Sequence, residues 1–271
     1  MANPRENSTG QAYRARLARV EASYPHNPER RSAYNKSAWA VRDSRLSPAA
    51  KKLALSTLYY GQVRMENFGQ GEEPVIDVTN GFNHYVDTST MEAIGAGLAS
   101  RITPYRPDAI DTIGNSGPLV SHTAAAMMGL NYLVTKKGKP PVTFVDGLIT
   151  ETHSFTGNNS VNLTVSGRVI RDTKIKRVGL IDDVLANGDT VMANIRLLEE
   201  QADLTIVCAA FAFIKTFGNG WNVLREYFNE RFNDPARVIS LLQLEELTPE
   251  WMKVAGISSP LYFLNPYSDK I

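Results

Sequence analysis

The sequence predicts an α/β protein built on a doubly wound, mostly parallel sheet, with a hood and a helical N-terminal extension. Short segments rich in Val, Ile and Leu alternate along the chain with segments of helical periodicity, which is the order that βαβ units produce. The chain has 271 residues, of which 43% are hydrophobic and 21% charged, so it can bury one large core. These values favour a single large domain with an appended segment.

The appended segment comprises residues 1–70 and is basic. Its residues 1–60 hold eleven Lys and Arg residues against four acids, although the whole chain has a formal net charge of +1. Helices are predicted over residues 11–22 and 48–60, the second after Ser47-Pro48 in the favoured order of cap and proline. Such a segment suits RNA, DNA, phosphate metabolites or the acidic remainder of the chain. Because no complete nucleic-acid recognition motif accompanies it, we expect no nucleic-acid partner.

Strands and helices alternate within the main domain, which is expected over residues 71–271. The predicted strands are 75–79, 109–113, 130–135, 161–165, 178–181 and 204–213, and the predicted helices are 89–100, 119–128, 191–200 and 221–228. A polar stretch with several Gly and Pro residues, about 136–160, is predicted to be a flexible lid or hood loop. Ligands of open parallel sheets bind beyond the carboxyl ends of the strands, so residues that follow strands are the candidates for chemistry.

The composition excludes several classes of protein. The longest apolar run, residues 204–214, is too short for a membrane helix, which needs about 20 residues. The first residues lack the apolar core of a secretory signal, so we expect a cytoplasmic protein without a membrane partner. Cys208 is the only cysteine and lies in the apolar run, which predicts a buried thiol and no internal disulfide. One cysteine and four scattered histidines provide no recognisable zinc site.

The most informative stretch is VGLIDDVLANGDT, residues 178–190. An apolar strand ends in Asp182 and Asp183, and a short turn containing glycine then leads into a helix. Adjacent carboxylates repel each other, which favours a ligand that offers hydroxyl groups or a cation. The turn behind them offers backbone amides and a helix N-terminus, which suit a phosphate. Together these features predict a sugar phosphate as ligand.

This stretch resembles the phosphoribosyl pyrophosphate signature of the type I phosphoribosyltransferases, which joins an apolar strand and two acids to a turn ending in Gly and a hydroxyl residue. The resemblance implies that Asp182 and Asp183 hold the ribose 2- and 3-hydroxyls and serve Mg²⁺, directly or through water or those hydroxyls. It also implies that the 5-phosphate is wrapped by Ala186, Asn187, Gly188, Asp189 and Thr190.

Two further stretches carry the same resemblance. GNSG, residues 114–117, follows a predicted strand and occupies the place of the family's pyrophosphate loop, which implies leaving-group contacts for Asn115, Ser116 and Gly117. TKKGKPP, residues 135–141, resembles the Arg-Lys-x-Gly-Lys-x-Pro stretch of the adenine-type branch, although Thr135 stands where an Arg is common. It implies that cations meet the pyrophosphate, with Lys136 and Lys139 as catalytic groups and Lys137 as a binding group.

Over residues 75–228 the chain resembles the xanthine phosphoribosyltransferases in particular. VTNGFNHYVD, residues 78–87, is similar to their Asn-His turn, and IKTF, residues 214–217, lies where they carry Glu-Lys-Ser-Phe. The resemblance implies that Asn83 contacts the base from the hood, that Lys215 donates a hydrogen bond to the exocyclic oxygen of a 6-oxopurine, and that the protein is a homodimer. Ile214 replaces the Glu, so an unusual base of specialised metabolism stays open beside xanthine-type oxopurines.

The predicted function is Mg²⁺-dependent transfer of ribose 5-phosphate from phosphoribosyl pyrophosphate to a purine or purine-like base, as in purine salvage, with release of pyrophosphate. The alternative from another class is a non-catalytic regulator that senses phosphoribosyl pyrophosphate and binds nucleic acid through its basic N-terminal segment. The lysines at positions 136, 137 and 139 favour catalysis, because a sensor does not need to bind the leaving group. Residues 1–70 also lack a winged-helix pattern.

Overall fold

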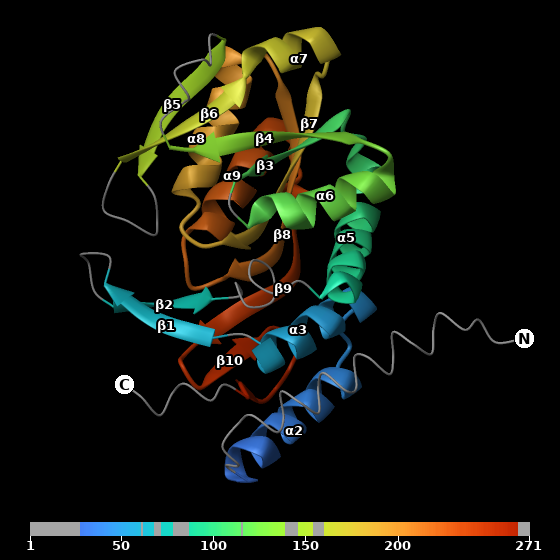
Figure 1. Cartoon of the computed structure of the whole chain (residues 1–271), viewed down its shortest axis with the longest axis vertical. Helices are drawn as coiled ribbons and strands as arrows, with labels where there is room; N and C mark the ends of the chain where they lie inside the picture. The colour runs from blue at the N-terminus through green and yellow to red at the C-terminus, as the bar shows by residue number, and fades with distance from the viewer. Residues whose placement is uncertain are drawn as a thin grey trace, which may run out of the picture.

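The computed structural model describes residues 28–60, 62–67, 72–77, 87–114, 116–138, 146–153 and 160–264. Within these ranges, nine strands form one sheet in the order β11-β10-β9-β8-β7-β3-β4-β6-β5 (Figure 1). The strands at its centre are parallel: β4 (Asn131–Lys137), β3 (Ala109–Ile113), β7 (Arg177–Leu185), β8 (Thr205–Lys215) and β9 (Val238–Leu247). The predicted fold class is confirmed.

Antiparallel strands extend the sheet at both edges. On one side β6 (Ser160–Ser166) pairs with β4 and with β5 (Gly147–His153). On the other side β10 (Trp251–Val254) pairs with β9 and with β11 (Leu261–Tyr262). Strands β9, β10 and β11 are not predicted from the sequence, although residues 238–242 of β9 form a largely apolar run.

The prediction of a loop over about 136–160 is wrong for its described part. β4 runs to Lys137, and β5 is a regular edge strand whose Ile149 and Glu151 are exposed while Thr152 is buried. This alternation has the period of a strand, but its polar residues and the flanking Gly and Pro residues resemble loop composition. Residues 139–145 and 154–159 lie outside the described ranges.

Helices cover both faces of the sheet and divide its apolar residues into two cores. One core lies under α5 (Thr88–Ile102) and α6 (Gly117–Met128), and the other under α8 (Asp189–Arg196) and α9 (Gly220–Phe232). β8 is buried along nearly its whole length and contributes to both cores. Cys208 on this strand is fully buried and burial raises the pKa of its thiol to about 12, as expected for an unreactive cysteine. Among the described helices, none combines the length and the apolar composition that a bilayer span requires.

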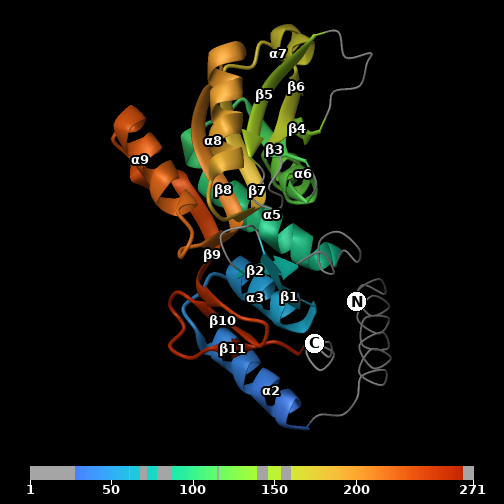
Figure 2. The same ribbon diagram turned by 90° about the vertical axis from the view of Figure 1, so that its left-hand side faces the viewer.

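The N-terminal helices α2 (Pro28–Asp43) and α3 (Pro48–Tyr60) pack against the C-terminal strands. The backbone N–H of Tyr262 donates to Ser37 Oγ at 2.8 Å, and that of Leu264 donates to Leu58 O at 2.9 Å. α3 is followed by the hairpin β1 (Gln62–Asn67) and β2 (Glu72–Asp77). Figures 1 and 2 show these elements below the lower ends of β7 and β8, where the N-terminal helices and the C-terminal strands pack together. The helix predicted over 11–22 lies outside the described residues, and the domain boundary at residue 70 stays a prediction.

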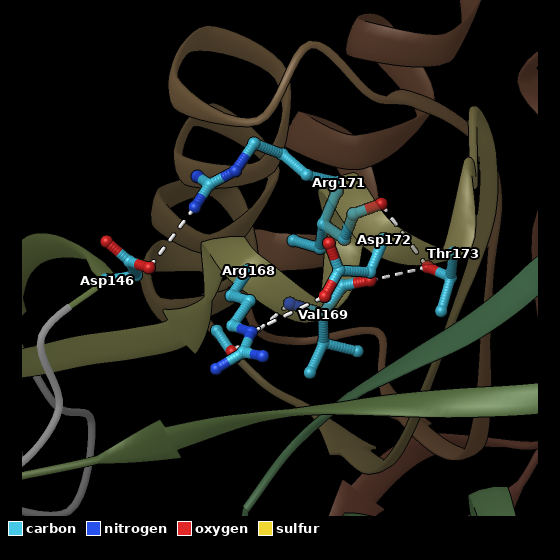
Figure 3. A network of polar contacts seen from close by, with 8 residues as sticks. Asp146, Arg168, Val169, Arg171, Asp172 and Thr173 are labelled. Atoms are coloured by element: carbon cyan, nitrogen blue, oxygen red, sulfur yellow. Dashed lines mark hydrogen bonds and ion pairs between the residues drawn. The ribbon is translucent and has the colours of Figure 1, made fainter.

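The short helix α7 (Gly167–Thr173) fixes the base of the β5–β6 hairpin (Figure 3). The backbone N–H of Gly167 donates to Asp146 O at 3.0 Å, and the Asp146 carboxylate pairs with Arg171 at 3.3 Å. Arg168 and Asp172 form a second ion pair at 3.5 Å. Because the side chains of both pairs are exposed, each contributes little to stability, and only the pair of Asp146 and Arg171 links α7 to the start of β5.

Candidate active site

The site lies where the winding of the sheet reverses. β4 follows β3 on one side, whereas β7 adds to the other side of β3. Ligands of open α/β sheets bind beyond the carboxyl ends of the strands at such a switch point. The turn after β3 therefore lies between the acids at the end of β7 and the lysines at the end of β4. The described site residues predicted from these three strands meet at one edge of the sheet.

The acid pair lies inside β7, near its carboxyl end. The strand extends to Leu185, beyond the predicted strand end at residue 181. Asp182 Oδ1 accepts a hydrogen bond from the N–H of Asp183 at 3.0 Å, and Asp183 Oδ1 accepts one from the N–H of Val184 at 2.9 Å. Burial and the neighbouring Asp183 carboxylate raise the pKa of Asp182 well above its ordinary value, while the charge of Lys137 opposes this shift. A cation or hydroxyl donors at this position would reduce the electrostatic repulsion between the carboxylates.

The first turn of α6 lies directly against this pair. A Cβ atom at Gly117 would overlap Asp182 Oδ1 and would lie 2.5 Å from Thr112 Oγ1, so any larger residue would require these side chains to move. The position of Gly117 places the positive end of the helix beside a carboxylate. Ser116 precedes it and is half-buried, whereas Asn115 lies outside the described residues. The predicted pyrophosphate turn is thus adjacent to the predicted ribose acids.

The turn after β7 leads into α8 with the geometry of an anion site. Gly188 has φ +89°, a left-handed conformation that favours glycine, and it is the N-cap of α8. The first helix amides have no carbonyl partner in the preceding turn, so they are available to an anion. Asp189 is exposed and Thr190 is half-buried. The hairpin strand β5 reaches this turn, since Thr152 Oγ1 donates to Asp189 O at 3.4 Å.

The described lysines of β4 differ in their placement. Lys136 and Lys137 are both exposed at the end of the strand, where successive side chains point to opposite faces. The charge of Lys137 lowers the pKa of Asp182, so this lysine lies near the acid pair. The role of Lys136 stays a prediction, and Lys139 lies outside the described residues. Thr135, in the place of the common Arg, is buried and faces β3.

The end of β8 carries the predicted base contact. Lys215 is 3% exposed and its Nζ lies 5.9 Å from the ring centroid of Phe217, which is 47% exposed. Ile214, in the place of the family's Glu, is fully buried in the core beneath α8 and α9. Its side chain therefore serves packing. Asn83 and the rest of residues 78–86 lie outside the described ranges.

The acid pair fits Mg²⁺ that is shared with a substrate. Within the described part of the chain, no group of three His, Cys, Asp or Glu side chains could enclose a metal ion. Mg²⁺ characteristically takes one or two carboxylates and completes its shell with substrate phosphates and water. Asp182 and Asp183 provide such carboxylates beside a turn suited to phosphate, so they are the residues that would hold the ion.

A buried polar cluster behind the site is not predicted from the sequence. Asp111 on β3 is fully buried and accepts hydrogen bonds from Thr135 Oγ1 at 3.1 Å and from Asn194 Nδ2 at 2.6 Å. It joins the strand before the pyrophosphate turn to β4 and to the helix that begins at the phosphate turn. Burial raises the pKa of Asp111 to about 7, although both hydrogen bonds oppose this. The one available signal is an acid inside the apolar strand AIDTI.

We expect Asp111→Asn to remove a pH dependence of stability. The folded protein keeps this carboxyl protonated up to about pH 7, whereas an unfolded chain ionises it near its ordinary value of 3.8. Folding therefore binds a proton between these values, and the free energy of unfolding falls as the pH rises through this window. At about 1.4 kcal/mol for each pH unit, the loss amounts to a few kcal/mol. Asparagine stays neutral and can bond to both partners.

Urea unfolding of wild type and Asp111→Asn at pH 5 and pH 8 measures this effect. The difference in unfolding free energy between the two pH values should be smaller in the variant, which gains relative to wild type at pH 8. An equal pH difference in both proteins would show that Asp111 does not titrate in this window.

Solved structures of similar fold are adenine phosphoribosyltransferases, although no family model matches the chain. The enzyme of Trypanosoma brucei, in complex with AMP, pyrophosphate and ribose-5-phosphate, gives a TM-score of 0.55 at 21% identity and covers 74% of this chain and 81% of its own. The enzyme of Giardia lamblia, complexed with 9-deazaadenine, gives 0.54 at 18% identity and covers 74% and 99%. The fold is that of the phosphoribosyltransferases.

Curated relatives place the sequence more narrowly. The xanthine phosphoribosyltransferase of Chloroflexus aurantiacus is 36% identical over 154 residues, which are 56% of this chain and 70% of the relative. That of Geobacillus thermodenitrificans is 29% identical over 174 residues, which are 64% and 84%. The chain belongs to the type I phosphoribosyltransferase family. It is an enzyme, a pentosyltransferase of the purine type.

Proposed function

We propose that this enzyme transfers the 5-phosphoribosyl group of phosphoribosyl pyrophosphate to a xanthine-type 6-oxopurine and releases pyrophosphate. One observation carries the proposal. The acid pair of β7 continues into a left-handed glycine turn at the N-terminus of α8, and Gly117, at the start of α6, packs against Asp182. This arrangement supports the binding of one pentose by hydroxyl acceptors and two anion-binding turns.

The sugar is held through its hydroxyls and its 5-phosphate. Asp182 and Asp183 accept hydrogen bonds from the ribose 2- and 3-hydroxyls, which explains why two carboxylates stand side by side. The 5-phosphate accepts hydrogen bonds from the backbone of residues 186–190, where the helix dipole adds to the attraction. Asp189 is exposed, so its carboxylate can be solvated away from the phosphate.

In the transfer step a base nitrogen displaces pyrophosphate from C1 of the ribose with inversion. The bond to the leaving oxygen breaks ahead of the new bond, so positive charge builds up on the ring and negative charge on the pyrophosphate. The groups that meet the leaving group stabilise this state: the amides of residues 114–117, Lys136, Lys137 and Lys139. Mg²⁺ bound with the substrate supplies further neutralisation of the phosphate charge. No covalent intermediate is needed.

The base is recognised at the end of β8. We assign the buried Lys215 as the donor to the exocyclic oxygen of the base, with Phe217 beside it. Asn83 is proposed to contact the base from the hood. Ile214 stands beside this lysine in the place of the family's Glu, so an unusual base stays open as the alternative to a xanthine-type oxopurine.

We also propose that the protein is a homodimer and acts in the cytoplasm. Helix α6 exposes Leu119 and Met127, apolar side chains of the kind that subunit contacts cover. A substrate with several phosphate charges does not cross membranes unaided, which favours a cytoplasmic site of action. Light scattering after gel filtration should give twice the chain mass of 29.9 kDa. A particle of one chain mass would contradict the dimer.

Pyrophosphate release with a panel of bases tests the activity. Protein, Mg²⁺ and phosphoribosyl pyrophosphate are incubated with xanthine, hypoxanthine, guanine or adenine. Release with an oxopurine, xanthine above all, is the expected result. Release with adenine alone would overturn the assignment of the base. Binding of phosphoribosyl pyrophosphate without release for any base would overturn the catalytic role.

A further inference from the structure

The turn that follows the base segment packs against the phosphate turn, backbone against backbone. Residues 218–220 lie between the end of β8 and the start of α9, and the N–H of Gly220 donates to Ala186 O at 2.9 Å. The sequence alone indicates no role for these residues. The contact joins the segment of Lys215 to the turn proposed for the 5-phosphate.

Only glycine allows this approach. A Cβ atom at Gly220 would lie 2.5 Å from Ala186 O and 2.8 Å from Gly188 N, and one at Gly218 would lie 2.7 Å from Ala186 O. Real Cβ atoms essentially never come within 3.0 Å of such neighbours. Gly218 and Gly220 are not among the glycines with positive φ, so the contact and not the backbone conformation requires them.

The hydrogen bond also orients the phosphate turn. Because a peptide unit is planar and trans, its C=O and its N–H point in opposite directions. Gly220 holds the carbonyl of Ala186, so the N–H of Asn187 in the same peptide unit points away from residues 218–220. In the proposed function, the 5-phosphate binds on the side to which the N–H of Asn187 points.

We propose that Gly218 and Gly220 are positioning residues for the sugar phosphate. They hold the turn at 186–188 so that its amides face the 5-phosphate. The inference deepens the proposed function and rests on it. The pyrophosphate turn after β3 is not part of the contact, so the two anion sites should respond differently to a change at residue 220.

The test compares Gly220→Ala with wild type by calorimetry, with ribose 5-phosphate and with pyrophosphate as separate ligands in the presence of Mg²⁺. We expect the Kd for ribose 5-phosphate to rise about tenfold or more, as the loss of charge-assisted hydrogen bonds implies, and the Kd for pyrophosphate to stay within about twofold. In kinetics, KM for phosphoribosyl pyrophosphate should rise far more than kcat falls. If Gly220→Ala does not fold, Gly218→Ala provides the same comparison.

Gly97→Ala is the matched control. A Cβ atom at Gly97 would lie 2.6 Å from Ala49 Cβ where α5 meets α3, so it causes a similar clash outside the phosphate turn. This variant should lower the melting temperature and leave both dissociation constants unchanged. An equal loss of affinity for both ligands in Gly220→Ala, or an unchanged Kd for ribose 5-phosphate, would overturn the positioning role. Failure of wild type to bind either ligand would instead overturn the proposed function.

Discussion

Replacing Asp182 and Asp183 together by asparagine is expected to lower kcat/KM for phosphoribosyl pyrophosphate by about a thousandfold or more, in line with the loss of preorganised charge in other active sites. The carboxylates are the acceptors for the ribose hydroxyls and the residues that would hold Mg²⁺. Amide groups accept weaker hydrogen bonds and carry no charge for the cation.

The double variant should nevertheless fold. Burial and mutual repulsion already raise the pKa of Asp182. Neutral side chains therefore remove the unfavourable free energy of placing two carboxylates together in the folded state. The oxygen of asparagine can still accept the N–H of the following residue, as Asp182 and Asp183 do at 3.0 Å and 2.9 Å. Circular dichroism, thermal melting and binding of phosphoribosyl pyrophosphate by calorimetry separate loss of function from loss of fold.

Asp172→Asn serves as the control for a lost acid. Asp172 is exposed, pairs with Arg168 on α7 and lies outside the site (Figure 3). Its replacement should leave kcat and both KM values unchanged. If the double variant retained wild-type kinetics, the acids would have no part in binding the activated sugar.

Lys215→Ala is expected to raise KM for the base by about a hundredfold and to change KM for phosphoribosyl pyrophosphate by only a few fold. A buried charged donor to a carbonyl oxygen is among the stronger hydrogen bonds, and a base pocket that loses it discriminates poorly. Lys215 is 3% exposed at the end of β8, whereas the proposed sugar contacts come from β7 and α8.

Lys215→Met separates charge from packing. Methionine fills similar space without a hydrogen-bond donor. Lys215→Met should therefore keep a melting temperature closer to that of wild type than Lys215→Ala does, with the same rise in KM for the base. Steady-state kinetics with each substrate varied in turn gives both KM values. An equal loss of affinity for base and sugar would show that Lys215 does not contact the base.

The local sequence is sufficient to predict the strands that carry the site. β3 matches the predicted strand 109–113, because a short apolar run bounded by Pro107 and Gly114 leaves little freedom. The acids and the glycine turn of residues 182–188 are contiguous, so their chemistry can be interpreted before their surroundings are known. The polar edge strand β5 is missed because its composition is that of a loop.

Contacts between distant segments cannot be predicted in this way. The hydrogen bond from Asn194 to Asp111 joins residues 83 positions apart, and the bond from Tyr262 to Ser37 joins residues 225 apart. Gly220 reads as an ordinary turn residue until its approach to Ala186 is seen. Helix α3 of the basic N-terminal extension is predicted by its cap and proline, whereas α2 is not, and the packing of both on the C-terminal strands depends on the completed fold.

The most direct test is a crystal structure of the protein with Mg²⁺ and phosphoribosyl pyrophosphate. The account predicts the ribose hydroxyls at the carboxylates of Asp182 and Asp183, the 5-phosphate at the backbone of residues 186–190, and the pyrophosphate between residues 114–117 and the lysines of β4. Density for the ligand elsewhere, or crystals in which this edge of the sheet stays empty at saturating ligand, would contradict it.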